Sequence, residues 1–270
     1  MIGNRYVAMI DILGFKNMTV EKGLRTIVNI IRELIDKVEK YESSISLSRR
    51  DVGGWKTRSV EFHFDKIHFS DTIICWTKPF NNDDLDDEYL IAESFLSGIA
   101  HIIFWGFIKD IPLRAGIGFG ESYIDIKERI IAGQAIIDAY EAEKVQEWIG
   151  GAFHPNCAVH SNCNIERASK SHGSHIINYR VPVKKCTKLK LEFALDWTSS
   201  ATSLAIIPGE IPGELEIGPN DNQGVLEKAF YNYLNKDIEQ EIKCKYENAQ
   251  KFYEYQFNRR PKKIVHGPLE

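Results

Sequence analysis

Two aspartates, Asp11 and Asp71, stand among apolar residues and are the first candidates for chemistry. Asp11 follows the apolar stretch "YVAMI", and Asp71 stands between "KIHFS" and "TIICW". An unpaired carboxylate in such surroundings is costly or takes up a proton, so each aspartate needs a cleft or a positive partner. Hard divalent cations such as Mg²⁺ or Mn²⁺ prefer oxygen ligands, and a pair of them serves phosphoryl transfer. The pattern indicates a two-metal site if the carboxylates converge, whereas a single aspartate at a strand end or turn is more often structural.

The predicted order of elements would bring these aspartates together. Residues 5–12 are typical of a strand, and residues 60–78 of two strands that meet at Ser70 and Asp71. In a split βαββαβ sheet the first strand lies beside that hairpin, so Asp11 and Asp71 would face each other. This order favours an α+β sandwich over a doubly wound parallel sheet. The other expected elements are helices at 20–42 and 86–108, a loop at 43–59, a strand at 111–125, a short strand and helix over 129–148, strands near 151–159 and 175–182, and one long helix at 223–257.

The composition is that of an ordinary soluble globular chain. Its 270 residues are 43% hydrophobic, and a net charge of −4 with a pI near 6.1 gives no basic footprint for nucleic acid or an anionic membrane. The most apolar window, residues 95–108, is too short for a membrane span and indicates a buried helix. No secretory leader is visible, and five cysteines without framework spacing indicate a reducing, cytoplasmic location.

Four motifs, in this order along the chain, resemble those of the class III nucleotidyl cyclases. "AMIDILGF" is similar to the family's first metal-binding strand, and "KIHFSDTIICW" to the hairpin that carries its second metal aspartate. "LRAGIGFGES" is similar to the next core strand, and "AGQAIIDAYEAE" to the helix after it. Phe-Ser-Asp in the hairpin and Ala-Tyr-x-x-Glu in the helix most resemble the bacterial pyrimidine cyclases of the Pycsar anti-phage systems. The resemblance covers residues 5–197.

This resemblance implies a fold and a role for each matched residue. The fold would be a ferredoxin-like-derived catalytic domain over residues 1–198, with a connector and C-terminal helix over residues 199–270 packed on the domain or dimer. Asp11 and Asp71 would bind two Mg²⁺ or Mn²⁺ ions, with the backbone carbonyl of Ile12 as a further ligand. Arg114 would grip the β- and γ-phosphates, because a planar guanidinium suits phosphate oxygens.

The resemblance also implies partners. The substrate would be a pyrimidine nucleoside triphosphate, cyclised to the 3′,5′-cyclic monophosphate as a messenger that a separate effector protein reads. Each site would be completed across a head-to-tail homodimer. We expect no nucleic acid partner and no membrane span, as the charge and the apolar windows indicate. Lys184 or Lys185, in "VPVKKC", would fall near the family's second phosphate-binding position. Two adjacent lysines are more usually just solvated.

The helix after Gly133 departs from the purine cyclases. Their ribose-orienting Asn and transition-state Arg fall at Ile137 and Glu141 here, and neither side chain can do that work. Tyr140 and Lys144 share a helix face at i and i+4 and could substitute for them. The alternative is that Tyr140 packs and Lys144 is solvated.

The base-reading positions of the purine cyclases also differ. They fall at Ile67 and Ile130, which cannot hydrogen-bond a purine edge. We therefore expect a pyrimidine, and the resemblance favours UTP over CTP. A purine cyclase, a non-catalytic nucleotide-sensing module on the same fold and a metal-dependent phosphohydrolase stay as alternatives.

Two further patterns carry weaker expectations. His154, Cys157, His160 and Cys163 are all zinc-ligand types, but their spacing does not match a usual zinc knuckle or finger, so we expect packing or turn residues. The glycines of "GIGFG" at 116–120 lie inside an apolar strand rather than before a helix. We expect them to permit close backbone approach and not to cradle phosphate.

Overall fold

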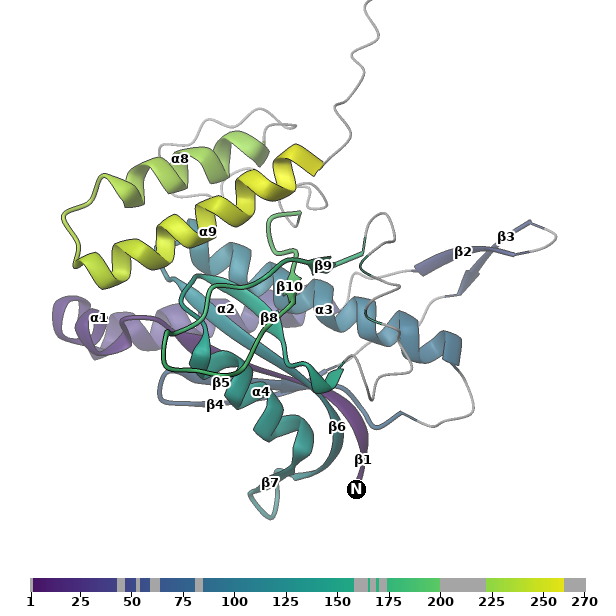
Figure 1. The fold of residues 1–270 in the computed structure, drawn as a ribbon. Coiled ribbons are helices and arrows are strands. Elements are labelled where there is room, and N and C mark those ends of the chain that lie inside the picture. Colours follow the sequence, from purple (N-terminus) through teal and green to yellow (C-terminus); the bar gives the residue numbers. More distant parts are fainter. Residues whose placement is uncertain are drawn as a thin grey trace, which may run out of the picture.

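The computed structural model describes residues 2–42, 47–51, 54–58, 64–80, 85–157, 165, 169, 174–199 and 222–259, and the structural findings concern these residues. An eight-stranded sheet forms their centre, with helices on both of its faces (Figure 1).

The sheet confirms the predicted α+β class with a βαββαβ core. Its strand order is β4-β5-β1-β6-β8-β10-β9, with β7 paired to β6. Each of the first four strands is antiparallel to its neighbours among them, and β8 joins β6 in parallel after a helical crossover. As predicted, β1 lies beside the hairpin formed by β4 and β5. The strands are β1 (Ile2–Ile12), β4 (Asp65–Phe69), β5 (Thr72–Trp76), β6 (Leu113–Asp125), β7 (Ile130–Gly133), β8 (Gly150–Phe153), β9 (Ile176–Asn178) and β10 (Phe193–Leu195).

The alternation of side chains along β1 separates two layers. Tyr6, Ala8 and Ile10 join the main core with helices α2 (Leu24–Glu42) and α3 (Leu85–Ile108). Val7 and Met9 belong to a second cluster with α4 (Gln134–Val145) on the opposite face. Successive residues of a strand point to opposite faces, so the next odd-numbered residue, Asp11, lies on the α4 face.

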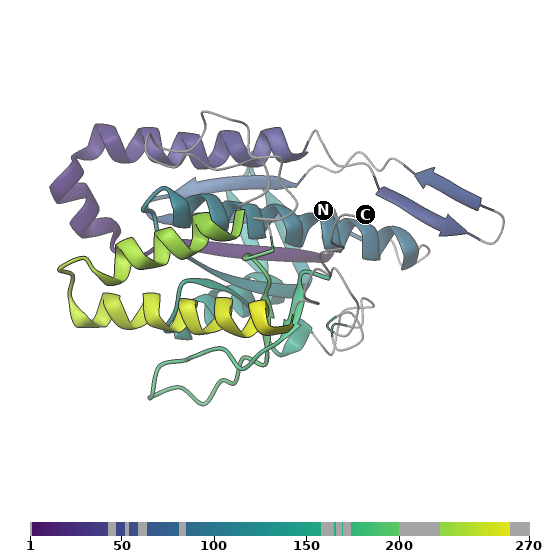
Figure 2. The same ribbon diagram turned by 90° about the horizontal axis from the view of Figure 1, so that it is seen from above.

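The C-terminal segment extends the main core. Helices α8 (Asn222–Leu234) and α9 (Gln240–Arg259) lie side by side (Figures 1 and 2). The hydroxyl of Tyr233 donates to the carbonyl of Phe107 at 2.6 Å, and the rings of Phe107 and Phe230 are 4.6 Å apart. These contacts fasten the helix pair to the end of α3.

Three local predictions were wrong. The helix expected at 20–42 is two helices, α1 (Phe15–Lys22) and α2, because Gly23 takes a left-handed φ of 78° that breaks the hydrogen-bonded series. The loop expected at 43–59 contains the hairpin of β2 (Leu47–Asp51) and β3 (Gly54–Arg58), a separate two-stranded ribbon whose polar sequence gives no strand alternation (Figure 2). The single helix expected at 223–257 is interrupted after Leu234 by "NKD", whose Asn and Asp favour turns.

Helix α3 is the one helix in the described segments that is long and apolar enough to cross a membrane. Its window Ile91–Ile108 has a mean hydropathy of 1.6, and 83% of that window is buried inside the protein. The core location agrees with the buried helix predicted over residues 95–108.

Two glycines of β6 let α4 approach the sheet closely, as predicted. A Cβ atom at Gly116 would collide with the backbone carbonyl of Ala139, and one at Gly118 with that of Ala135. The obstructing atoms are backbone, so no side-chain rotation relieves the collision.

We predict that Gly116→Ala lowers the free energy of unfolding by about 3 kcal/mol or more, because α4 must move away from the sheet. Urea unfolding monitored by circular dichroism measures the loss. Ala132→Val, which adds carbons at an exposed position of neighbouring β7, is the control and should change stability by about 0.5 kcal/mol or less. A Gly116→Ala protein as stable as the control would contradict the close packing.

Candidate functional site

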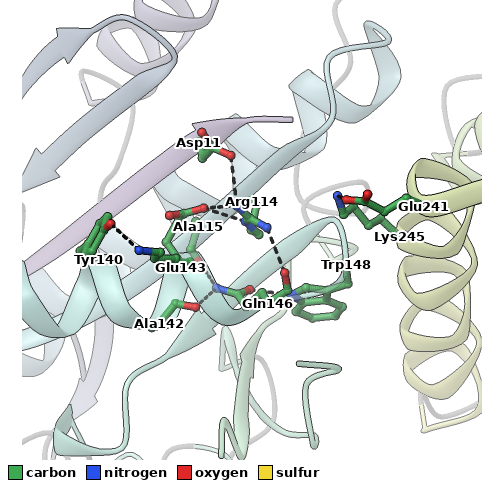
Figure 3. A network of polar contacts seen from close by, with 11 residues as sticks. Asp11, Arg114, Ala115, Tyr140, Ala142, Glu143, Gln146, Trp148, Glu241 and Lys245 are labelled. Carbon is green, nitrogen blue, oxygen red and sulfur yellow. Dashed lines mark hydrogen bonds and ion pairs between the residues drawn. The ribbon is translucent and has the colours of Figure 1, made fainter. Parts of the chain in front are cut away.

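Asp11 and Arg114 form a cross-strand pair on the α4 face of the sheet. They are direct partners in the antiparallel register of β1 and β6. Nη2 of Arg114 donates to Oδ2 of Asp11 at 3.2 Å, as drawn in Figure 3. The strand register alone thus places a carboxylate beside a guanidinium.

The tight turn between β4 and β5 brings Asp71 to the same place. Ser70 takes a positive φ of 58°, which reverses the chain, and Thr72 pairs with Asp11 across β5 and β1. The backbone N–H of Ile12 donates to the carbonyl of Asp71 at 3.0 Å. The negative charge of Asp71 is close enough to raise the pKa of Asp11. The two aspartates singled out in the sequence therefore lie together at one end of the sheet.

Arg114 is held by α4 and the residues that follow it. Its Nε donates to Oε1 of Glu143 at 2.7 Å, its Nη2 forms an ion pair with the same carboxylate, and its Nη1 donates to the carbonyl of Gln146 at 2.9 Å. The Gln146 side chain is itself fixed, since its amide donates to the carbonyls of Ala115 and Ala142. Arg114 is only 8% exposed, so these contacts set the position of its guanidinium.

Glu143 is a site residue that the sequence reasoning missed. It continues a buried helix face made by Ala135, Ala139 and Ala142. A carboxylate on a stripe of small, buried residues requires a cation nearby, and this was the available signal.

The site is short of positive charge. Burial raises the pKa of Asp11, and the charge of Asp71 raises it further, while Arg114 lowers it. Burial likewise raises the pKa of Glu143 against the opposing effect of Arg114. Two carboxylates, those of Asp11 and Glu143, thus contact a single guanidinium, and the charges of Lys184 and Lys245 act on Asp11 as weaker influences.

The donor set fits Mg²⁺ or Mn²⁺. Asp11 and Asp71 supply hard oxygen ligands, and a cation between them would offset the charge that raises the pKa of Asp11. The Ile12 side chain is a hydrocarbon without a ligand atom, so that residue could contribute only its backbone carbonyl. Within the described ranges no three His, Cys, Asp or Glu side chains are grouped to hold a metal. Such a site would need water or substrate oxygens as well, which is common for Mg²⁺.

The other predicted nucleotide-binding residues divide into two groups. Lys184 is fastened beside α4, because its N–H donates to the carbonyl of Val145 at 2.8 Å, and its charge acts on Asp11; Lys185 is exposed. Tyr140 and Lys144 contact each other on the exposed face of α4, with Nζ and the hydroxyl 3.0 Å apart. In Figure 3 Tyr140 lies apart from Asp11 and Arg114, farther along α4. A single chain does not bring this second pair to the aspartates.

The positions that read a purine in other cyclases are apolar here and differ in burial. Ile67 is half-buried against the cluster that contains Val7 and Trp76, and Ile130 is 42% exposed. Ile137 and Glu141, at the ribose and transition-state positions, are both exposed on α4.

The histidine–cysteine segment contributes packing residues where it is described. Nδ1 of His154 lies 3.5 Å from Asp138 and Nε2 lies 3.6 Å from Glu141. The Cys157 thiol donates to the carbonyl of Ile117, and burial raises its pKa. His160 and Cys163 lie outside the described residues.

No protein-family model matches the sequence, and no curated protein matches it. Three solved structures are similar in fold. The catalytic core of a rhodopsin-guanylyl cyclase with converted specificity, in complex with ATPalphaS, is 11% identical with a TM-score of 0.47, over 72% of this chain and 97% of that one. A bacterial light-regulated adenylyl cyclase is 11% identical with a TM-score of 0.37, over 73% and 92% of the two chains. The guanylyl cyclase Cya2 is 12% identical with a TM-score of 0.38, over 72% and 92%. All three are nucleotidyl cyclases, but at these identities and TM-scores the similarity carries no argument about substrate or mechanism.

Proposed function

We propose that this protein is a metal-dependent nucleotidyl cyclase that converts a pyrimidine nucleoside triphosphate to the 3′,5′-cyclic monophosphate and pyrophosphate. The observation that carries the proposal is the convergence of Asp11 and Asp71 beside Arg114, which is paired directly with Asp11. Three of the four sequence motifs that resemble class III cyclases supply these same three residues, one each.

The chain's own residues would bind and orient the reacting groups. Asp11 and Asp71 would hold Mg²⁺ or Mn²⁺, which supplies Lewis-acid activation of the ribose 3′-hydroxyl and charge neutralisation of the leaving pyrophosphate. The ribose 3′-oxygen attacks the α-phosphorus and forms the new P–O bond. The bond from the α-phosphorus to the oxygen that bridges it to the β-phosphate breaks, so pyrophosphate leaves, and the 3′-hydroxyl proton passes to solvent. Arg114 would contact the phosphates that depart.

The hydrogen bonds of Arg114 define how it could do this. A guanidinium has five N–H groups, and the contacts with Glu143, Gln146 and Asp11 leave one of those on Nη1 without a described partner. That group would be the one to donate to a phosphate oxygen. The N–H group that now donates to Asp11 would be a second donor if that carboxylate held a cation.

The choice of a pyrimidine rests on Ile67 and Ile130, which offer no side-chain hydrogen bond to a purine. UTP is preferred over CTP on the sequence resemblance alone. A cytoplasmic role in anti-phage defence, with the cyclic product read by a separate effector protein, rests on that resemblance too.

We predict that the protein with Mn²⁺ and each of four ribonucleoside triphosphates yields pyrophosphate and a cyclic product fastest with UTP. Asp71→Ala should lower the rate by about a hundredfold or more, because it removes a metal ligand. Asp65→Asn, an exposed carboxylate of the same hairpin, is the matched control and should stay near the wild-type rate. Nucleotide binding without turnover would favour the sensing module, a linear monophosphate would favour the phosphohydrolase, and preferred ATP or GTP would favour a purine cyclase.

We predict that Arg114→Ala lowers the free energy of unfolding by about 3–5 kcal/mol at neutral pH, because Glu143 becomes a buried carboxylate without its cation. The pKa of Glu143 is already raised above its usual value, and the substitution raises it further. A carboxyl whose pKa is higher in the folded state opposes folding when it is ionised. The loss of unfolding free energy caused by Arg114→Ala should therefore be complete above the folded-state pKa of Glu143, and it should shrink as the pH falls through that pKa. Urea unfolding at several pH values measures this.

The double variant Arg114→Ala/Glu143→Gln separates stability from function. It should recover most of the stability at neutral pH, because no ionised carboxylate stays buried at position 143, but none of the cyclase activity. Recovery of activity together with stability would show that Arg114 only supports the fold.

We predict a homodimer in which α4 of each chain completes the partner's site. The outward face of α4 carries Ile137 and Tyr140, which are 50% and 45% exposed, and large apolar side chains of this kind are typical of interfaces. Asp71→Ala chains and Tyr140→Ala/Lys144→Ala chains should each have little activity. Mixed dimers purified through two different tags should recover about half the wild-type rate, because one of their two sites is intact. Mixed dimers no more active than the parents would rule out shared sites.

A further inference from the structure

Helix α9 lies against the segment that holds Arg114. Along one of its faces, the side-chain amide of Asn248 donates to the carbonyl of Glu147 at 2.7 Å. One helical turn further, the ring of Phe252 stands at 85° to that of Trp148, with centroids 5.0 Å apart. Trp148 in turn donates from Nε1 to the side-chain carbonyl of Gln146 at 2.6 Å. The position of α9 is therefore fixed relative to the residue whose backbone carbonyl binds Arg114.

The same face of α9 carries a lysine toward the aspartates. Lys245 stands one turn before Asn248, and its side chain is only 13% exposed. Its Nζ donates to Oε1 of Glu241 at 3.0 Å, whereas the Glu241 side chain is 76% exposed. Figure 3 shows both side chains projecting from α9 toward Arg114. Lys245 therefore extends from the packed face of α9 on the side of that helix where Arg114 lies.

We propose that Lys245 binds the phosphate tail of the nucleotide at the Asp11 and Asp71 site, an inference that rests on the proposed function. A lysine ammonium is a compact charge on a flexible stem, so it can extend from a fixed helix to a phosphate oxygen. Its present partner Glu241 is mostly exposed, and exposed ion pairs contribute little, so exchanging that partner costs little.

The position of Lys245 in the chain makes this residue unexpected. The motifs that resemble the cyclases end near residue 197, and Lys245 lies beyond them in the C-terminal helix pair. That helix pair would then be part of the binding site and not only a support for the fold.

The test compares Lys245→Met with Lys251→Met, an exposed lysine of the same helix that makes only a long contact with Asn248. We expect Lys245→Met to raise both the KM for the nucleoside triphosphate and the inhibition constant of pyrophosphate by about tenfold, as for loss of one charged hydrogen bond. Lys245→Arg should retain most of the affinity, and Lys251→Met should resemble the wild type. Equal constants for Lys245→Met and Lys251→Met would overturn the proposal.

Removing the competing carboxylate should act in the opposite direction. Glu241→Gln releases Lys245 from its ion pair, so pyrophosphate should inhibit at a concentration several-fold lower. In the double variant Glu241→Gln/Lys245→Met this gain should disappear, which is the non-additivity expected of residues that act on one ligand. A gain that persists without Lys245 would show only a long-range effect of charge.

Direct binding of inorganic triphosphate, measured by calorimetry in the presence of Mn²⁺, separates this inference from the cyclase proposal. Triphosphate binding that depends on Lys245 in a protein that turns over no nucleotide would support the phosphate site and reject the cyclase. Nucleotide cyclisation with triphosphate binding that is independent of Lys245 would support the cyclase and reject the role of Lys245.

Discussion

The pairing of Asp11 with Arg114 across β1 and β6 is the constraint on which the site depends. The two residues are opposite each other in an antiparallel ladder that runs the length of β1, from Ile2 to Ile12. A slip of one residue would pair Asp11 with Leu113 or Ala115 and would turn one of the two charged groups to the other face of the sheet. Alternate apolar residues of β1 pack into two separate hydrophobic clusters, one on each face of the sheet, and a slip would move each of them to the wrong face. The hydrophobic pattern that forms the core thus also fixes the geometry of the charged groups.

The close approach of α4 turns this pair into a network. Gly116 and Gly118 leave no side chain between β6 and α4, so Glu143 can reach the guanidinium from the helix. Gln146 then binds the third nitrogen of Arg114 through its backbone carbonyl and is itself held by Trp148. Every step joins backbone or buried side chains, which leaves Arg114 little freedom. A preorganised guanidinium loses little entropy when it binds an anion.

The sequence predicted best those features that depend on neighbours along the chain. Asp11 and Asp71 could be identified because each interrupts an apolar run, and their neighbouring strands followed from the βαββαβ order. The glycines of β6 were recognisable because glycine inside an apolar strand has few explanations other than close packing. The division of the chain at residue 198 stays a prediction, while α8 and α9 pack into the main core.

The features that were missed depend on contacts between distant segments. Glu143 is the glutamate of the Ala-Tyr-x-x-Glu motif, but its contact with Arg114 could not be inferred until its alanine neighbours were found facing the sheet. Lys245 belongs to a polar helix whose only sequence signal is a common i, i+4 pair with Glu241. The break at Gly23 could have been predicted, but the strongly amphipathic residues after it favoured a single helix. Periodicity shows which face of an element is buried, but not which other element covers it.

The unbalanced charge of the site links binding to stability. Burial raises the pKa of both Asp11 and Glu143, and a neighbouring carboxylate raises each further (Asp71 for Asp11, and Asp11 for Glu143) against the opposing effect of Arg114. Such groups lower the free energy of unfolding of the protein when they are ionised in the folded state. A cation bound between Asp11 and Asp71 would restore that free energy, and binding to the native state alone stabilises the fold by mass action. The same electrostatic imbalance that weakens the free protein would therefore provide affinity for a metal and the phosphates that accompany it.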